Sequence, residues 1–559
     1  MKRRVFYHAP LRKLTVWLCA ALLLGQLAPI SALGQTTTPP AEADVVRFLE
    51  QATWGPTDAL ITRVQSIGYE AWLREQFSAP VSGYPNLPAP PANECEACPA
   101  GSPPTCQRDL YTLYPLRVKF FQNALTAPDQ LRQRVAFALH KIIVVSGNQI
   151  PLPSSMAPYL SILFNNALGN YRDILQQITL NPAMGDYLDM VNNAKPNPRT
   201  GVEPNENYAR EVLQLFSVGT VCLNPDGTVK KDNAGKPIPT YTQEQIEGFA
   251  FTFTGWTYAP LPGATSKWRN PRNYVAPMIL YRNAQGVDEQ HAKTAKELLQ
   301  YPNARFPQLP ANQDGETDLR QALDNIFYHP NVGPFIGAQL IHALVTSNPS
   351  PAYVRRVAAA FDNNGAGVRG DLKAVVRAIL LDPEARGASK TANDYGKLRE
   401  PVQFVTNVLR AFNATSDGNM ASAVKGLGQT LFVPPTVFSY FPADYVVPGT
   451  TLLGPEFGIQ STSTAVAHEN FVNKAVFSRF GDAAPAGTQL DLAACITLVA
   501  NPNALLDKLN RVMLHGTMSA AMRTEILNAI NAVSATDLKR RAQTAIYLVA
   551  ASSQYQVQR

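Results

Sequence analysis

Apolar residues recur at intervals of three and four along most of the chain, and this spacing restricts the fold more than any other feature. The pattern runs through residues 107–146, 156–180 and 316–412, and it returns between residues 463 and 555. Such spacing predicts amphipathic helices whose apolar faces pack into a common core. We therefore expect a mainly α fold, a multi-helix globular array.

Three segments interrupt the helical pattern. Residues 80–106 are rich in Pro, Ala and Cys, and residues 430–462 are rich in Pro, Gly and aromatic side chains. Long segments of this kind in a compact protein are functional or disordered, and their aromatic content favours ordered loops. Residues 221–241 place turn residues around short β-prone pieces, which predicts a small β-hairpin insertion. We expect the main helical domain to span residues 44–475 and a C-terminal helical region to span residues 476–559.

The amino terminus has the character of an export signal. Residues 1–13 are basic, residues 14–30 are apolar, and Ala32 and Gly34 fit the small-residue rule for cleavage. We predict a signal peptide over residues 1–34, a disordered leader over residues 35–43, and a periplasmic or secreted protein. The pair Arg3-Arg4 also fits a twin-arginine signal, so the export route stays open.

Charge and hydropathy exclude two classes of partner. The formal net charge is +7 over 559 residues, and the positive residues form no basic stripe interleaved with aromatics. Nucleic-acid binding is therefore not expected. No second apolar run has the length that crosses a bilayer, so we expect no transmembrane anchor after signal removal.

Cysteine usage fits an oxidising compartment. Three cysteines, Cys95, Cys98 and Cys106, fall within one Pro-rich loop. A thiolate zinc site there lacks a nearby fourth ligand, so we expect one local disulfide, with Cys222 a candidate partner for the third thiol. Cys495 is expected to remain free.

The segment PNENYAREVLQLFSVGT, residues 204–220, offers the clearest candidate for a polar site. On a helix its apolar residues form one core-facing stripe. Glu206 and Arg210, four residues apart, can form an ion pair. Asn207 and Glu211 share the flank beside Leu215, where the polar and apolar faces meet.

Several segments together carry a family resemblance that covers most of residues 45–475. PNENYARE and GFAFTFTGWTY, residues 248–258, resemble the hallmark of the bacterial domain of unknown function 1800 family. Further similar segments follow in the family's order: RFLEQATWGPT, HPNVGPFIGAQLI, FDNNGAGVRGDLKAVVRAILLDPEAR, KLREPVQFVTNVLRAF and PPTVFSYFPADYVVPGTTLLGPEFGIQ. The resemblance implies an exported bacterial protein, often encoded beside a sulfatase-like protein. It implies no reaction and no cofactor, which we leave as unknown.

The family pattern also points to His291 and Lys296 in the segment QHAKTAKELL. In the family an Asp usually follows the His and a Gly stands two residues further on, whereas this chain has Ala292 and Thr294. A role that needs that Asp is therefore in doubt, and His291 reads equally well as a surface loop residue. We predict no metal site.

Two functions fit these observations. The first is a hydrolase or lyase acting on an envelope or extracellular polymer. Glu211 would be its acid/base because burial can raise the pKa of a carboxyl group toward neutrality. The remaining candidates have supporting roles: Asn207, Arg210 and His291 beside the reacting group, and Glu206, Trp256, Tyr258 and Lys296 in substrate binding.

The alternative is a non-catalytic binding or scaffold protein for an envelope partner. The chain carries no HExxH pattern, phosphate-binding loop, dinucleotide fingerprint or GxSxG elbow. On this interpretation the polar segments only hold helices together.

Overall fold

The computed structural model describes residues 39–91, 96–392, 394–483 and 486–559. The predicted signal peptide, residues 35–38 of the predicted leader and Cys95 lie outside these ranges. Residues 40–559 form one compact unit. Its first helix, α1 (Glu42–Ala52), includes the last two residues of the predicted leader, residues 42 and 43, which are helical and not disordered.

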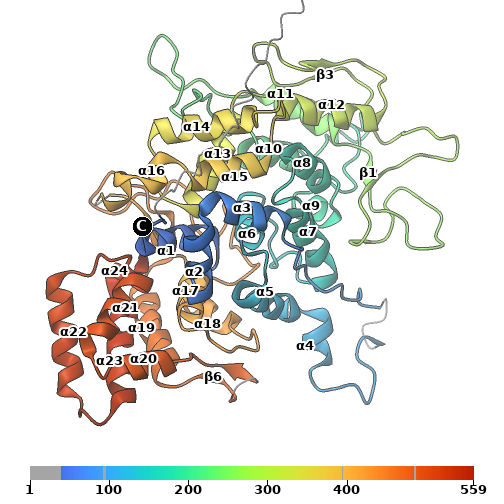
Figure 1. Cartoon of the computed structure of the whole chain (residues 1–559). Helices are drawn as coiled ribbons and strands as arrows, with labels where there is room; N and C mark the ends of the chain where they lie inside the picture. The colour runs from blue at the N-terminus through green and yellow to red at the C-terminus, as the bar shows by residue number, and fades with distance from the viewer. Residues whose placement is uncertain (1–38, 92–95, 393, 484–485) are drawn as a thin grey trace, which may run out of the picture. The chain divides into compact units, whose positions relative to one another are not determined.

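The predicted fold class is confirmed: the described residues are mainly helical, and their strands occur only as short antiparallel pairs (Figure 1). The helices of the first half of the chain, before residue 260, are α2 (Asp58–Ile67), α3 (Tyr69–Ser78), α4 (Cys106–Tyr111), α5 (Tyr114–Thr126), α6 (Gln130–Ile142), α7 (Pro153–Asn166), α8 (Tyr171–Thr179), α9 (Pro182–Tyr187), α10 (Asn207–Gln214) and α11 (Gln243–Thr252).

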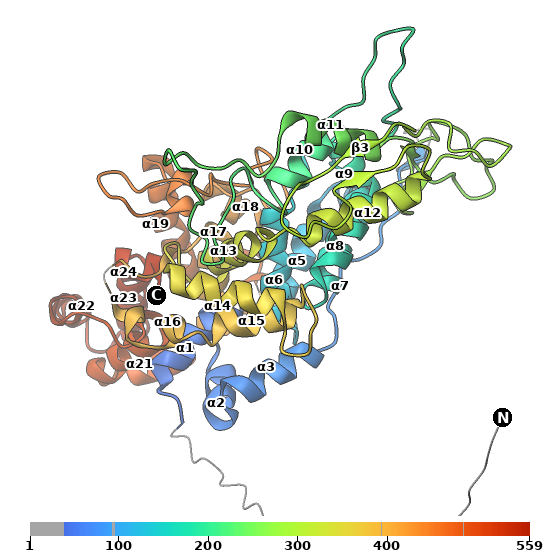
Figure 2. The ribbon, with the colours of Figure 1, turned by 90° about the horizontal axis from the view of Figure 1, so that it is seen from above.

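The helices of the second half are α12 (Gly315–Phe327), α13 (Val332–Leu344), α14 (Pro351–Asp362), α15 (Leu372–Leu380), α16 (Pro383–Arg386), α17 (Pro401–Ala411), α18 (Ala421–Gly426), α19 (Thr462–Phe477), α20 (Ala493–Leu498), α21 (Pro502–Leu514), α22 (Ala520–Ala532), α23 (Leu538–Ala550) and α24 (Ser553–Gln556). Helices α13, α14 and α15 lie side by side (Figure 2), and α19 to α23 pack around one another in the C-terminal region.

Side-chain caps fix many of these helix starts. Thr242 accepts a hydrogen bond from the backbone of Gln245, whose side chain bonds back to the backbone of Thr242, so α11 begins with a capping box. Asp314 accepts from two backbone N–H groups at the start of α12. Such caps satisfy donors that would otherwise have no partner inside the helix.

The strands of the described residues form four two-stranded antiparallel ribbons. They pair β1 (Trp256–Thr257) with β2 (Ile279–Leu280), β3 (Lys296–Glu297) with β4 (Gln308–Leu309), β5 (Lys397–Leu398) with β8 (Val557–Gln558), and β6 (Phe480–Gly481) with β7 (Gly487–Thr488). Residues 221–241 fold back antiparallel on themselves as expected, but only through isolated bridges such as Val221 with Pro239 and Lys231 with Pro237. The pairing is discontinuous there because turns at Gly227 and Gly235 interrupt it.

The cysteine-rich loop contains the expected local disulfide. Cys98 and Cys106 are bonded, and their Cα atoms lie 6.1 Å apart. The bridge ties the loop to the first residue of α4. Cys222 and Cys495 are free thiols, so the alternative partnership of Cys222 is not formed with any described cysteine. In the part of the chain that the structure describes, no helix has the length and apolar character to cross a membrane.

Candidate functional site

Helix α10 carries the polar flank that the sequence singled out. Its apolar stripe is buried as expected through Tyr208 and Val212. The predicted ion pair forms at the start of the helix: Arg210 Nη2 lies 2.8 Å from Glu206 Oε2, and both side chains are partly exposed. Gln243 donates to both oxygens of Glu206 at 3.0 Å. These contacts join α10 to the start of α11 at the surface.

Glu211 lies between this surface and the interior. One of its carboxylate oxygens, Oε2, is enclosed and has no hydrogen-bond partner among the described residues. Burial raises the pKa of Glu211, and the positive charge of Arg210 opposes that shift. Tyr187 and Tyr241 lie close enough to interact with the carboxylate electrostatically. A half-buried carboxyl with a raised pKa can hold or release a proton near neutral pH. Glu211 itself is not among the residues that line the two hollows described next.

A different hollow lies near each end of this flank. One turn before Glu211, Asn207 donates a hydrogen bond of 3.1 Å to Asp189. Asp189 lines an open polar hollow of about 690 Å³. One turn after Glu211, Leu215 lines a smaller cavity beside α13. The spacing of Asn207, Glu211 and Leu215 at every fourth residue places them in line along one side of the helix.

The polar hollow is rich in groups that bind hydroxyls and charges. Its lining includes Asp186, Asp189, Asn205, Arg272 and the predicted substrate-binding residue Tyr258. Burial raises the pKa of Tyr258 to about 12, and the charge of Asp186 adds to this effect. Tyr274 donates a hydrogen bond to Asp186 and packs edge-on against the ring of Tyr258.

His291 and Lys296 are buried away from both hollows. Asp318 Oδ2 lies 2.8 Å from His291 Nε2 and 2.7 Å from Lys296 Nζ, and all three side chains are fully buried. His291 Nδ1 faces the carbonyl of Thr254 at 3.0 Å, and Lys296 also donates to the carbonyl of Ala292 at 2.7 Å. Gln313 donates to the other oxygen of Asp318 at 2.6 Å. We call His291, Lys296 and Asp318 the sealed cluster, since all their charged atoms have protein partners.

The TGW segment, residues 254–256, packs against the sealed cluster through Thr254 and Gly255. Gly255 has φ +86°, and a Cβ there would meet the backbone of His291 at 3.0 Å. Thr254 Oγ1 accepts from the backbone of Ala292 at 2.9 Å. Trp256 is 4% exposed and borders a separate hollow with Met278 and Leu319. Of the residues predicted to share a site, Asn207, Arg210, Glu206 and Glu211 lie together on α10, whereas His291, Lys296 and Trp256 lie elsewhere.

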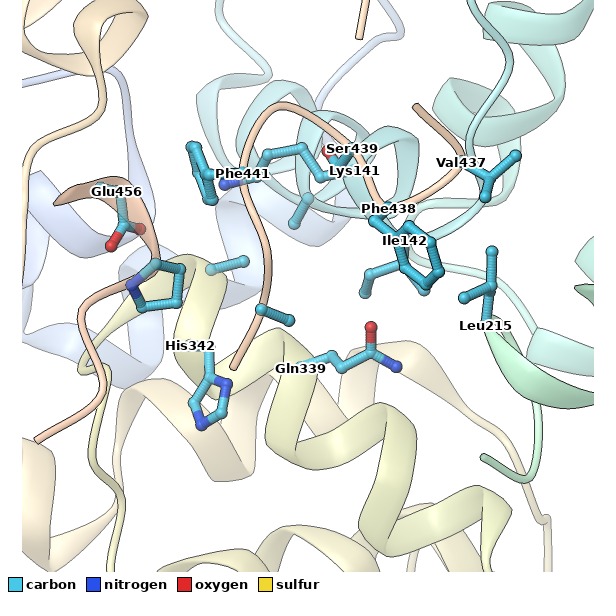
Figure 3. Close-up of a pocket in the computed structure, with 14 residues that line it drawn as sticks. Lys141, Ile142, Leu215, Gln339, His342, Val437, Phe438, Ser439, Phe441 and Glu456 are labelled. Carbon is cyan, nitrogen blue, oxygen red and sulfur yellow. The ribbon is translucent and has the colours of Figure 1, made fainter. Parts of the chain in front are cut away.

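The smaller cavity brings together residues that sequence reasoning did not select. This α13 cavity has a volume of about 120 Å³, and its polar lining is Lys141, Gln339, His342, Ser439 and Glu456. Gln339 and His342 come from α13, and Phe438, Ser439 and Phe441 come from the loop that faces it (Figure 3). The remaining lining is apolar and includes Leu215.

Two buried ion pairs flank the α13 cavity. Lys141 Nζ lies 2.7 Å from Glu400 Oε1, and Lys397 Nζ lies 2.8 Å from Glu456 Oε1. Burial alone would raise the pKa of Glu400, but Lys141 and Lys397 lower it to about 2. Burial lowers the pKa of His342 to about 4, and the charge of Lys397 adds to the shift, so the imidazole is neutral at pH 7. We call Lys141, Lys397, Glu400 and Glu456 the cavity cluster.

The family model described as a protein of unknown function, DUF1800, matches residues 47–557. The chain belongs to the DUF1800 family. No curated protein and no solved structure matches the chain. The DUF1800 match extends beyond the resemblance seen in the sequence, which ended near residue 475, and includes the C-terminal helices α20 to α24.

Of the groups that the sequence did not reveal, Asp318 could have been suspected from its place in the first turn of α12. Acidic residues are common in the first turn of a helix because they interact favourably with the helix dipole. The position of Asp318 therefore did not by itself indicate a functional residue. The cavity cluster joins α6, the segment before α17 and the loop before α19, and no local pattern indicates such a long-range pairing. Among the described residues, no group of three or more His, Cys, Asp or Glu side chains could hold a metal ion.

Proposed function

We propose that this protein is an exported hydrolase or lyase that acts on an envelope or extracellular polymer, with Glu211 as its acid/base. The observation that carries the proposal is the enclosed, unpartnered Oε2 of Glu211 on a carboxyl group whose pKa is raised by burial. An enclosed carboxylate oxygen without a protein partner is costly unless a water molecule or a ligand pairs with it.

The polar hollow supplies the substrate-binding surface in this proposal. It is open, it is lined by carboxylates, amides, guanidinium groups and Tyr258, and Asn207 connects it to the flank that carries Glu211. Hydroxyl-rich polymers are bound by such mixtures of polar and aromatic groups. Arg210 and Glu206 would orient the helix start, and Arg210 would stabilise the ionised form of Glu211 after proton transfer.

Export is part of the proposal because a disulfide between Cys98 and Cys106 is stable in an oxidising compartment. The basic and apolar residues at the amino terminus support a signal peptide over residues 1–34. Periplasmic or secreted localisation can be tested by fractionating cells that express the full chain and probing each fraction for its disulfide.

The catalytic role of Glu211 is tested with Glu211→Gln and the surface control Glu75→Gln, since Glu75 lies on α3 and forms an exposed pair with Arg63. We would assay both against purified peptidoglycan, polyuronates and chromogenic glycosides, measuring reducing ends and the ultraviolet absorbance of unsaturated products. Turnover by the unchanged protein and by Glu75→Gln, with a loss of at least about 100-fold in Glu211→Gln, is expected for an acid/base. Equal turnover in Glu211→Gln would disprove the role.

A stability measurement separates catalytic loss from unfolding. The folded state binds the Glu211 proton more tightly than the unfolded state because burial raises the pKa. The ionised carboxyl therefore destabilises the protein at pH 7, and Glu211→Gln removes this penalty. We expect Glu211→Gln to unfold at a temperature equal to or above that of the unchanged protein at pH 7. The difference should shrink as the pH falls through the native pKa, and it should vanish below the ordinary pKa of 4.5, where the carboxyl is protonated in both states.

A non-catalytic scaffold is the second candidate, and the sealed cluster favours it. His291, Lys296 and the TGW segment have their contacts within the protein, as expected of residues that hold helices together. The partner would be the sulfatase-like protein that the family resemblance implies. Co-expression followed by size-exclusion chromatography of the two purified proteins tests this: a stable complex without turnover of any polymer supports the scaffold, and separate elution excludes this partner.

A further inference from the structure

The α13 cavity is surrounded by polar atoms that have no partner. Glu456 is 3% exposed and Ser439 is 7% exposed, yet Glu456 Oε2 and Ser439 Oγ make no hydrogen bond with any described residue. Gln339 Nε2 is likewise enclosed without a partner. The imidazole of His342 lines the same cavity. Three unpartnered atoms, from α13, from the loop at Ser439 and from the segment at Glu456, therefore lie around one small space.

The ion pairs around the cavity do not supply hydrogen-bond partners for these atoms. Lys397 binds the other oxygen of Glu456 and the carbonyl of Ala343. Lys141 binds Glu400, whose second oxygen accepts from Gln429 at 2.7 Å. Each lysine thus already has an anionic partner, while Oε2 of Glu456 remains available as an acceptor.

The backbone at Ser439 is held in an uncommon conformation. Its φ is +75°, in the left-handed region that non-glycine residues rarely adopt. Such conformations persist where the surrounding structure enforces them, and they cluster at ligand-binding sites. Here the conformation fixes the position of Ser439 on the loop opposite α13, next to Phe438 and Tyr440.

The chemistry of the lining restricts the ligand. The two lysines of the cavity cluster are paired with its two carboxylates, so the charges balance and the cavity offers no net counter-charge to an anion or a cation. The ligand must donate to Glu456 and accept from Gln339, whereas Ser439 and His342 can do either. Hydroxyl groups both donate and accept, and they carry no charge.

We infer that the α13 cavity binds a neutral polyhydroxyl group, such as a short polyol or the end unit of a sugar chain. The apolar lining, with Phe441 and the 54% exposed Phe438, suits the C–H faces of such a group and marks the side on which the cavity opens. A cavity of about 120 Å³ has room for several water molecules, which is the scale of a short polyol. This site is separate from Glu211, so it stands whether or not Glu211 acts as an acid/base.

The test is binding of small probes to the purified full chain. We would titrate glycerol, glucose and N-acetylglucosamine by saturation-transfer nuclear magnetic resonance, with acetate and methylammonium as charged probes of similar size. We expect at least one neutral probe to bind, and Ser439→Ala and Gln339→Leu each to weaken it at least tenfold.

Ser155→Ala is the matched control, because Ser155 also has a buried hydroxyl without a partner but lies on α7 outside the α13 cavity. Its affinity for the neutral probe should equal that of the unchanged protein. If Ser439→Ala fails to fold, Gln339→Leu alone decides. Binding of acetate in preference to the neutral probes would overturn the inference. So would neutral binding that both variants leave unchanged, or a crystal structure grown with glycerol in which ordered water alone fills the cavity.

Discussion

The sealed cluster and the cavity cluster are both groups of buried charge, and they differ in how completely their polar atoms are satisfied. In the sealed cluster, both oxygens of Asp318 and both nitrogens of the His291 ring have protein partners. In the cavity cluster, Glu456 keeps one oxygen free, and Ser439 and Gln339 beside it are also unpaired.

This difference separates a structural role from a binding role more clearly than residue type does. A histidine next to a lysine and an aspartate has the composition of an active site, but here each charge is already used by the fold. A fully satisfied buried network stabilises one conformation, whereas unsatisfied atoms are costly unless another molecule pairs with them.

Breaking the sealed cluster should have the largest effect on stability. Asp318→Ala leaves Lys296 and His291 buried without their anion, and the removal of one partner from a buried pair costs about 3–5 kcal/mol. The free energy of unfolding from urea denaturation measures this loss. Glu206→Ala, which breaks only an exposed pair, should cost at most about 1 kcal/mol. Equal losses in the two variants would contradict a structural role for Asp318.

The cavity cluster should make stability depend on pH. The folded pKa of Glu400 is about 2, below its ordinary value of 4.5, so the unfolded state binds the proton more tightly. The contribution is complete above pH 4.5 and is lost as the pH falls toward 2. We expect Glu400→Gln to lower the free energy of unfolding by about 3 kcal/mol at pH 7, and the gap to close in acid.

Urea denaturation between pH 7 and pH 3 measures that gap directly. Glu75→Gln is the control, because Glu75 forms an exposed pair with Arg63 and its replacement should shift stability little at any pH. A gap for Glu400→Gln that stays constant down to pH 3 would show that its charge is not what stabilises the fold.

A matched pair of glutamines should give the smallest and most discriminating effect. Gln313 donates to Asp318 in the sealed cluster, so Gln313→Leu should cost about 1–3 kcal/mol. Gln339 has an enclosed amide nitrogen without a partner, so Gln339→Leu should leave stability unchanged or raise it. The unfolding temperatures of the two variants in ligand-free buffer measure this difference. An equal loss of stability in both variants would contradict the distinction between the two clusters.

The helical architecture could be predicted from sequence because periodicity is a local property. The stripe on α10 and the pair of Glu206 with Arg210 both follow from residues within one or two turns. The isolated bridges of residues 221–241 also reflect local turn chemistry. The ribbon between β5 and β8 could not be foreseen, because it joins residues that are far apart in the chain and only two residues long on each side.

The candidate site was only partly accessible to the same reasoning. The position of Glu211 at the border of two faces was a helical property, and it lies at such a border in the fold. The sealing of His291 depends on Asp318, which follows it by 27 residues. The α13 cavity depends on packing between α6, α13 and a distant loop, so the sequence carried no sign that Ser439 or Gln339 would lack partners.

One further contact has a consequence for how the protein is made. Glu50 in α1 is buried between Arg399 and His515, each at 2.7 Å, and Lys397 in the neighbouring ribbon pairs with Gln558. A nascent chain on the ribosome therefore presents its first helix hundreds of residues before Arg399 or His515 has been synthesised. The chain can therefore reach its native state only after translation has passed residue 558. During that interval chaperones can bind the incomplete chain and keep it unfolded.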